Sequence, residues 1–185
     1  IQGYIKTDDG KTKSTNYLSA DKSNFKQSKT SAGQFNVDFS FNLKSSLSSG
    51  QYFWIGNSMC SQNKKYKLKF QATDGQVVLS KAGDNNQEIP IWKNNKVNYG
   101  QTPNDALITL YTGSLAVIKS LKPVWKANEV TLPESSYYHT DLQDDGNLVT
   151  YSKEGNNPND AIWNTLTDVG RNPASKTDYY FTNCY

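Results

Sequence analysis

The chain has 185 residues, enough for one domain with a single core, and 35% of them are hydrophobic. This fraction is below the usual ~45–50%, and no apolar run approaches the ~20 residues of a membrane-spanning helix, so a membrane protein is excluded. The net charge is only +3 and Arg171 is the single arginine, so nucleic acid binding is not expected. Twelve Tyr, seven Phe and four Trp supply large side chains for a core, which indicates a folded domain with a polar surface.

The N-terminal part of the chain is predicted to be a polar extension. Residues 1–33 are rich in Ser, Lys, Asn and Asp, and residues 7–10 read Thr-Asp-Asp-Gly, a turn sequence. From residue 35, polar side chains alternate with the apolar residues Phe35, Val37, Phe39 and Phe41. This period of two predicts a half-buried strand. We therefore expect an extension over 1–33, a folded domain over 34–166 and a C-terminal extension over 167–185.

The sequence beyond residue 60 repeats one unit three times and predicts no helix. Each copy contains an alternating run, a glycine-centred turn, a second alternating run, a polar loop, and a β-branched residue followed by Trp. The copies span about 67–92, 106–125 and 138–163. Each one reads as a hairpin plus a returning strand, which is too small to bury its own apolar face. Around a common axis, three copies would share an aromatic core of Trp92, Trp125 and Trp163.

The third copy carries a run of polar and aromatic side chains around its turn. Five of them occupy every second position: Gln143, Asp145, Asn147, Val149 and Tyr151. On a flat strand they would spread over roughly 26 Å, but a turn at Asp145 and Gly146 brings the two arms together. The set then offers two amides, a carboxylate, an apolar patch and a phenol, which suits one pyranose ring. The alternative is an ordinary hairpin in which Asp145 or Asn147 only bonds the turn backbone.

The pattern Gln-x-Asp-x-Asn-x-Val-x-Tyr, followed by a polar loop and Ile-Trp, resembles the monocot-type (bulb-type, B-type) mannose-binding lectins. The resemblance covers about residues 43–165. It implies an all-β fold, the β-prism II, in which three antiparallel four-stranded sheets surround a pseudo-threefold axis. It also implies that Gln143, Asp145 and Asn147 bind mannose hydroxyls, that Val149 packs on the sugar ring, and that Tyr151 hydrogen-bonds a hydroxyl.

The other two copies depart from this pattern. Counted from its turn, the first copy is a possible degenerate second site with Asp74, Gln76 and Val78. Its Gln71 is one position off and Ser80 replaces the tyrosine, so we expect this site to lack both groups unless a bulge at Ala72 re-aims the chain. The second copy, over 110–118, keeps the hairpin and loses nearly every polar ligand, so we expect it to be structural.

Two cysteines, Cys60 and Cys184, are the only ones in the chain. An even number fits a disulfide in an oxidising compartment, and the bridge would stabilise the fold by roughly 4–5 kcal/mol; two buried free thiols are the alternative. The chain starts at Ile1 without a leader, which fits a secreted protein whose signal has been removed, or a shortened chain. The resembling lectins often exchange a terminal strand between protomers, whereas a Cys60–Cys184 bridge would hold the C-terminal segment on its own first repeat.

The sequence does not predict an enzyme, a cofactor or a metal site. His139 is the only histidine and has no evident partner for a nucleophilic triad. One histidine and two distant cysteines fall short of a zinc ligand set. Asp144 and Asp145 are adjacent and would face opposite ways along a strand, so they would not flank a glycosidic bond.

We therefore expect a secreted lectin that binds mannose-containing glycans through one intact hairpin site. The alternative is a secreted structural or protein-interaction module on the same scaffold, with little or no sugar binding. That module would form a homo-oligomer through its terminal extensions. The last residues offer exposed or edge-strand aromatics for this purpose: Tyr179, Tyr180, Phe181 and Tyr185.

Overall fold

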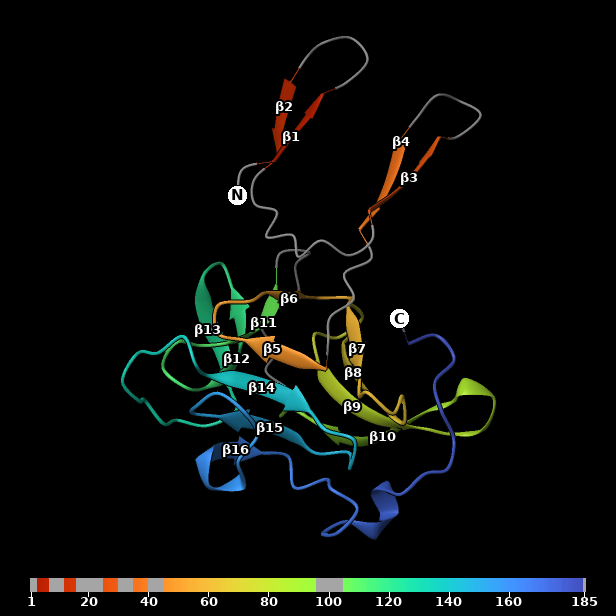
Figure 1. The fold of residues 1–185 in the computed structure, drawn as a ribbon, viewed down its shortest axis with the longest axis vertical. Coiled ribbons are helices and arrows are strands. Elements are labelled where there is room, and N and C mark those ends of the chain that lie inside the picture. The colour runs from red at the N-terminus through yellow and green to blue at the C-terminus, as the bar shows by residue number, and fades with distance from the viewer. Residues whose placement is uncertain are drawn as a thin grey trace. The chain divides into compact units, whose positions relative to one another are not determined.

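The chain divides into two compact units, residues 1–42 and 43–185. The computed structural model describes residues 3–6, 12–15, 25–29, 35–39, 45–95 and 105–184. In the first unit, β1 (Gly3–Lys6) pairs with β2 (Thr12–Thr15), and β3 (Phe25–Lys29) pairs with β4 (Phe35–Phe39) (Figure 1). The strand expected from residue 35 is therefore present as β4, but its partner is β3. The domain boundary that we expected at residue 34 lies inside this first unit.

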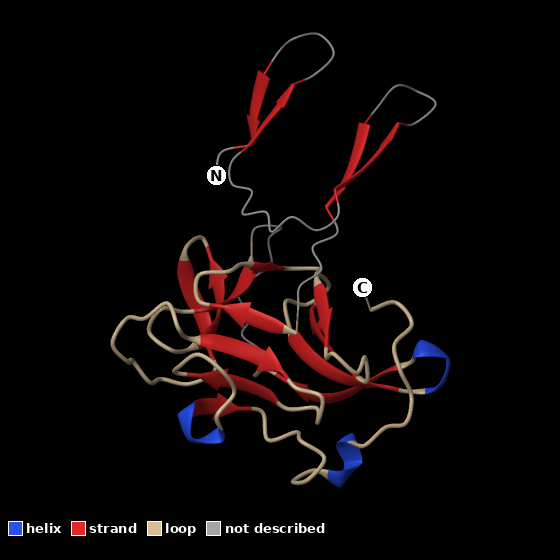
Figure 2. Ribbon diagram, in the orientation of Figure 1, coloured by secondary structure: helices blue, strands red, loops and turns tan. Residues whose placement is uncertain are grey.

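The second unit is built from three antiparallel four-stranded sheets (Figure 2). The first sheet contains β7 (Ser58–Cys60), β8 (Tyr66–Phe70), β9 (Val77–Ala82) and β10 (Glu88–Lys93). The second contains β6 (Phe53–Trp54), β11 (Ala106–Thr109), β12 (Leu115–Lys119) and β13 (Lys122–Lys126). The third contains β5 (Ser46–Ser48), β14 (His139–Leu142), β15 (Leu148–Tyr151) and β16 (Ala161–Asn164). This is the all-β, three-sheet fold that the sequence predicts.

In the described residues of this unit, short helical turns interrupt the loops at three places. They are 3-10 helices at Asp84–Asn86, Pro158–Asp160 and Pro173–Ser175. No helix in the described ranges has the length and apolar character to cross a membrane.

One short segment supplies a strand to each of the three sheets of the second unit. Between residues 46 and 60 the chain forms β5, β6 and β7 in turn, and each becomes an edge strand of a different sheet. Two of these strands have partners far along the chain, since β5 pairs with β14 and β6 pairs with β11, whereas β7 pairs with the next strand, β8. Each repeat therefore provides three strands of a sheet and receives its fourth from this leading segment.

The inner faces of the three sheets meet in one core. Its fully buried side chains are mostly Leu and Phe, including Leu47, Phe53, Leu68 and Leu107. The three repeat tryptophans come together, with the ring of Trp92 at 6.3 Å from that of Trp125 and 5.9 Å from that of Trp163. These indoles are only partly buried and pack against the aliphatic core. The aromatic group therefore lies beside the apolar core and does not form its centre.

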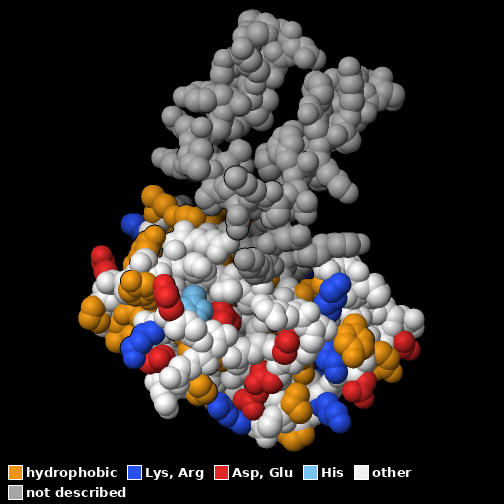
Figure 3. All heavy atoms as spheres, in the orientation of Figure 1, with side chains coloured by type: hydrophobic (Ala, Val, Ile, Leu, Met, Phe, Trp, Pro, Cys, Tyr) orange, Lys and Arg blue, Asp and Glu red, His pale blue; other side chains and the backbone are white. Residues whose placement is uncertain are grey.

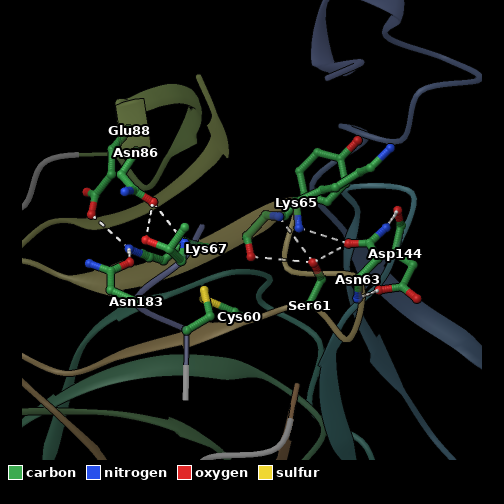
Figure 4. The surroundings of a disulfide bond; sticks show 12 residues. Cys60, Ser61, Asn63, Lys65, Lys67, Asn86, Glu88, Asp144 and Asn183 are labelled. Carbon is green, nitrogen blue, oxygen red and sulfur yellow. Dashed lines mark hydrogen bonds and ion pairs between the residues drawn. A yellow bond between two sulfur atoms is a disulfide. The ribbon is translucent and has the colours of Figure 1, made fainter. Parts of the chain in front are cut away.

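The C-terminal segment packs on the first sheet of its own chain. Cys60 and Cys184 form the expected disulfide, and Lys67 donates to Asn183 Oδ1 at 2.9 Å (Figure 4). Phe181 is fully buried beneath the Lys67 ammonium, which lies 4.1 Å from the ring centroid. Phe181 is therefore not one of the exposed aromatics that we expected, whereas Tyr179 and Tyr180 are exposed. Tyr185 lies outside the described residues.

Candidate functional site

The third hairpin folds at the predicted turn. Gln143 N donates to Asn147 O at 2.9 Å and Gly146 N donates to Gln143 O at 3.1 Å, so residues 144–146 form a three-residue turn. Leu142 and Leu148 face each other across the strands and are buried in the core. Because side chains alternate along a strand, Gln143 and Val149 lie on the opposite, outer face of the sheet.

The rest of the unit holds this turn in place. The Tyr66 ring lies directly against Gly146, and the Tyr66 hydroxyl donates to Ser175 O at 3.2 Å. On the other side, Asn63 N donates to Asp144 Oδ1 at 2.8 Å, and Asn63 Nδ2 donates to Asp144 O at 2.7 Å (Figure 4). The turn is therefore fixed by the first sheet and by the loop that follows the disulfide cysteine.

The two arms of the hairpin bring Gln143 and Tyr151 together. Gln143 Nε2 donates to the Tyr151 hydroxyl at 2.6 Å, and the His139 ring stacks on Tyr151 with centroids 5.4 Å apart. This contact is the convergence that the sequence predicts. It occupies one polar atom of each group and leaves the amide oxygen of Gln143 as an acceptor and the hydroxyl hydrogen of Tyr151 as a donor.

Asp145 and Asn147 are organised in the same way. Asp145 Oδ1 accepts from Asn147 N at 2.9 Å, which caps the turn. Asn147 Oδ1 accepts from Thr165 Oγ1 at 3.0 Å and from Thr167 N at 3.3 Å, which anchors the chain that leaves β16. In the described part of the chain, no hydrogen bond engages Asp145 Oδ2 or Asn147 Nδ2. Each side chain therefore has a structural role at one atom and leaves its second polar atom unengaged there.

Burial makes the phenols around this hairpin hard to ionise. Burial raises the pKa of Tyr151; the hydrogen bond from Gln143 lowers it, and the nearby carboxylates of Asp141 and Asp145 raise it. The pKa of Tyr66 is raised by burial and then by Asp145. The Tyr151 hydroxyl is thus kept protonated, as a hydrogen-bond donor must be.

This burial predicts a loss of stability at alkaline pH. An unfolded tyrosine ionises near pH 10, so the stability that these neutral phenols confer is complete below that pH. It should then fall as the pH rises through 10 toward the higher folded pKa values. Urea unfolding between pH 8 and 11 measures this slope, which the Tyr66→Phe and Tyr151→Phe double variant should flatten. Tyr179→Phe, at an exposed position, is the control; equal slopes in all three proteins would contradict the prediction.

The first hairpin is closer to the motif than the sequence indicates. Gln71 N donates to Gln76 O at 2.8 Å, as Gln143 does to Asn147, and Asp74 Oδ1 accepts from Gln76 N at 3.1 Å, as Asp145 does. Its turn, 72–75, is one residue longer than the turn at 144–146. The extra residue therefore lies in the turn, and Gln71 matches Gln143. The expectation that this site lacks its Gln does not hold, whereas the Tyr position is Ser80.

Other parts of the first hairpin are covered. Val78 is buried to the same degree as Val149 in the third hairpin, but Ser80 lies opposite Lys67, whose ammonium lies over the Phe181 ring of the C-terminal segment. The outer face of the first sheet is thus occupied at one end by the chain's own terminus.

The outer face of the second sheet is apolar. Ile108, Ala116 and Ile118 form a buried cluster, with Leu110 packed against it at the position that matches Gln143. At the five motif positions only Thr112 and Ser114 are polar, and Ser114 Oγ donates to Asn128 O at 3.1 Å, in agreement with the structural role expected for the second copy.

A hollow of about 370 Å³ lies beside the third hairpin. Its lining comes from β5, β14, residues 136–138 and residues 154–156, and includes His139, Asp141 and Glu154. None of the five motif residues lines it. Sequence reasoning missed it because its parts are far apart in the chain; the only signal was the placement of His139 and Asp141 at alternate positions before Gln143.

The sequence and the structure were compared with those of known proteins. No family model matches the sequence, and no curated protein matches it. Among solved structures, a monomeric monocot mannose-binding lectin from Gastrodia elata is 26% identical, with a TM-score of 0.52. The match covers 68% of this chain and 100% of that lectin.

Two further plant lectins are similar at lower scores. A Polygonatum cyrtonema lectin, solved in complex with monomannoside, is 25% identical with a TM-score of 0.49; the match covers 61% of this chain and 94% of that one. A mannose-specific lectin from Crocus vernus is 21% identical with a TM-score of 0.48, over 66% of this chain and 96% of that one. Together with the three-sheet architecture, the Gastrodia likeness shows that the second unit has the β-prism II fold of the monocot mannose-binding lectins.

Proposed function

We propose that the third hairpin is a binding site for one mannose-type hexose and that the protein is a secreted lectin. The observation that carries the proposal is that each polar side chain of the motif has one polar atom in an internal hydrogen bond and a second one unengaged. The internal hydrogen bonds fix the positions of four side chains: Gln143, Asp145, Asn147 and Tyr151. The remaining atoms form two acceptors and two donors within one short hairpin, a set that complements vicinal hydroxyls.

Each group has a defined part in this proposal. Asp145 Oδ2 and Gln143 Oε1 accept hydroxyl hydrogens of the sugar, while Asn147 Nδ2 and the Tyr151 hydroxyl donate to its oxygens. Val149 and Tyr151 are each 3% exposed, so they form the floor of the site and not its rim. The lectins of similar fold from Gastrodia and Polygonatum, named for mannose binding and for a monomannoside complex, support the choice of mannose.

The site predicts weak binding of a single sugar. Water competes for every hydrogen bond, so each one gains only about 0.5–1.5 kcal/mol. After the cost of association, a few such bonds correspond to a dissociation constant in the millimolar class. Useful retention on a cell surface or a resin would then come from several linked sites.

The test is a calorimetric or NMR titration with methyl α-mannoside. Asp145→Asn keeps a turn-capping oxygen but removes the charge, and Tyr151→Phe removes the hydroxyl while it preserves the stacking on His139. We expect Asp145→Asn to weaken binding about tenfold or more, since a hydrogen bond to a charged group contributes about 1.5–3 kcal/mol. Tyr151→Phe should weaken it by about two- to tenfold, since a neutral hydrogen bond contributes about 0.5–1.5 kcal/mol. The melting temperature should stay within a few degrees.

The matched control is Asp74→Asn, which makes the same change at the same turn position of the first hairpin. It should leave mannoside binding within twofold of the wild type. Undiminished binding in both site variants, or no binding by the wild type, would contradict the proposal.

Secretion is supported by the disulfide between Cys60 and Cys184, because such bonds persist in oxidising compartments. Alkylation of the protein as it is isolated from its native source, before and after reduction, measures the redox state of the two thiols. We expect no free thiol before reduction. A fully reduced protein would contradict a secreted location.

A further inference from the structure

The turn between β12 and β13 presents a leucine to the solvent. Lys119 pairs with Lys122 across the two strands, so Ser120 and Leu121 form a two-residue turn. Their φ values are +49° and +64°; a turn with two positive φ values prefers Asn-Gly, because bulky side chains are strained there. Leu121 is nevertheless 84% exposed, so burial in the fold does not offset this strain. A strained and exposed apolar residue at a hairpin end points to a function outside the fold.

The hairpin that carries this turn is basic. Residues 106–128 include neither Asp nor Glu but three lysines: Lys119, Lys122 and Lys126. The whole chain has 20 basic and 17 acidic residues, so the rest of the chain has equal numbers of both. The acidic residues that flank this range are Asp105, which is buried, and Glu129. The hairpin therefore carries a local positive charge equal to the net charge of the protein.

Aromatic side chains extend the apolar surface along the same end of the second sheet. Strand register places four residues in one row next to the turn: Trp54, Ala106, Ile118 and Pro123. Trp54 is 41% exposed and stacks on Tyr52, which is 42% exposed, with ring centroids 5.0 Å apart. In Figure 3, hydrophobic side chains in orange gather with blue ones at the end of the unit where Figure 1 places the β12–β13 turn. This end of the sheet thus combines an exposed leucine, two exposed rings and lysines.

The second sheet has no competing role in sugar binding. Leu110 replaces the glutamine of the motif and Ile118 replaces its tyrosine, and both belong to the apolar group on the outer face. The outer face of the third sheet carries the proposed mannose site, and the C-terminal segment covers one end of the first. The hairpin end of the second sheet is therefore available for a different ligand.

The chemistry of this surface matches the interface of an anionic lipid bilayer. Trp and Tyr rings are favoured at the level of the lipid headgroups, because they have an apolar body and a polar edge. An apolar side chain at a protruding turn can enter the boundary between headgroups and acyl chains, while flanking lysines contact the anionic headgroups. An acidic protein or a nucleic acid would bind the lysines but would not account for the leucine.

We propose that the β12–β13 turn attaches the protein to the surface of anionic lipid membranes. Leu121 enters the interface, Lys119 and Lys122 contact the headgroups, and Trp54 and Tyr52 lie at headgroup level beside them. This peripheral contact needs no membrane-spanning segment. It also does not depend on the sugar site proposed for the third hairpin, which lies on another sheet. A membrane that carries mannosylated molecules would be held at two points at once, which raises the overall affinity.

The test is flotation of the full-length protein with sugar-free vesicles. One set contains phosphatidylcholine alone, and the other contains equal parts of phosphatidylcholine and phosphatidylserine. We expect binding to the anionic vesicles only, with a bound fraction that falls as salt screens the lysines. Lys122→Glu removes one positive charge and adds a negative one, so it should weaken binding about tenfold or more.

Leu121→Asn separates the apolar contact from the charge. It should weaken vesicle binding about fivefold or more, because the transfer of the leucine side chain into the interface is lost. Asn accepts a positive φ more readily than Leu, so the melting temperature should not fall. A loss of binding by this variant therefore cannot come from unfolding.

The chain offers a matched control for each variant. Leu166 has a φ of +57° and is 57% exposed, but the nearest charged residue along the chain is Asp168. Leu166→Asn should leave vesicle binding within twofold of the wild type. Lys93→Glu makes the same charge change as Lys122→Glu at an exposed position of the first sheet, and it should weaken binding less than threefold.

Three results would overturn the proposal. The first is no binding of the wild type to anionic vesicles, and the second is equal binding by the wild type and Leu121→Asn. The third is binding to soluble polyglutamate that matches vesicle binding and is lost in Lys122→Glu but kept in Leu121→Asn, which would identify an acidic macromolecule as the partner. Because the vesicles carry no sugar, none of these results bears on the function proposed for the third hairpin.

Discussion

Replacement of both Cys60 and Cys184 by alanine is expected to lower the free energy of unfolding by roughly 4–5 kcal/mol. The bond joins residues 124 apart, so its removal frees a long loop in the unfolded chain. In a domain of this size the melting temperature should fall by about 10 °C or more. Urea denaturation and a thermal scan measure both quantities, and reduction of the wild type should reproduce the loss.

A second variant separates the covalent bond from the contacts around it. Phe181→Ala keeps the disulfide but removes a fully buried ring from the first sheet, at an expected cost of about 3–5 kcal/mol. A double cysteine variant as stable as the wild type would show that packing of the terminus, and not the bond, holds it in place. The Asn63–Asp144 contact near the bond connects this region to the third hairpin, so the proposed sugar binding should weaken in parallel.

Gly146→Ala is expected to be the most damaging single substitution in the third hairpin. Gly146 has a φ of +90°, where a side chain costs about 1–2 kcal/mol, and its new Cβ would lie 2.5 Å from Tyr66 Cε1. The Tyr66 ring is 2% exposed and its hydroxyl is bonded to Ser175 O, so it has little room to move. Such overpacking adds about 1–3 kcal/mol. Unfolding should be easier by about 2–5 kcal/mol, and mannoside binding should be lost.

The chain offers a matched control for this glycine. Gly56 has a φ of +91°, but nothing lies within 4 Å of a Cβ placed there. Gly56→Ala should therefore cost only the backbone term of about 1–2 kcal/mol and leave sugar binding intact. Equal destabilisation by the two variants would show that the contact with Tyr66 contributes nothing.

The repeat hairpins could be predicted because their signals are local. Alternation identifies both arms of each hairpin, and the glycines mark the turns, so β8–β9, β11–β12 and β14–β15 lie where the copies were expected. The leading strands β5, β6 and β7 were missed since each has only two or three residues, too few for a periodicity. The pairing of β5 with β14 and of β6 with β11 is in addition a tertiary effect that no local pattern records.

The third hairpin could be predicted in outline but not in its hydrogen bonds. Spacing located the turn and the approach of Gln143 to Tyr151, because both follow from one fold in the strand. The anchoring of Asn147 by Thr165 and Thr167 was not predictable, since these residues follow a later strand. For Gln71, counting positions failed because a turn absorbed one extra residue without any change in strand register.

The single leading segment of the prism limits how such a fold can grow or shrink. Because β5, β6 and β7 complete three different sheets, the unit that repeats in the sequence is not a complete building block in space. A fourth copy added at the end would form three strands of a sheet, but the leading segment would have no further strand to complete it. Deletion of a copy would leave one leading strand without its sheet. The number of hairpins in the prism is therefore fixed by residues 46–60, and diversity has to arise through changes in the hairpins and in the loops between them.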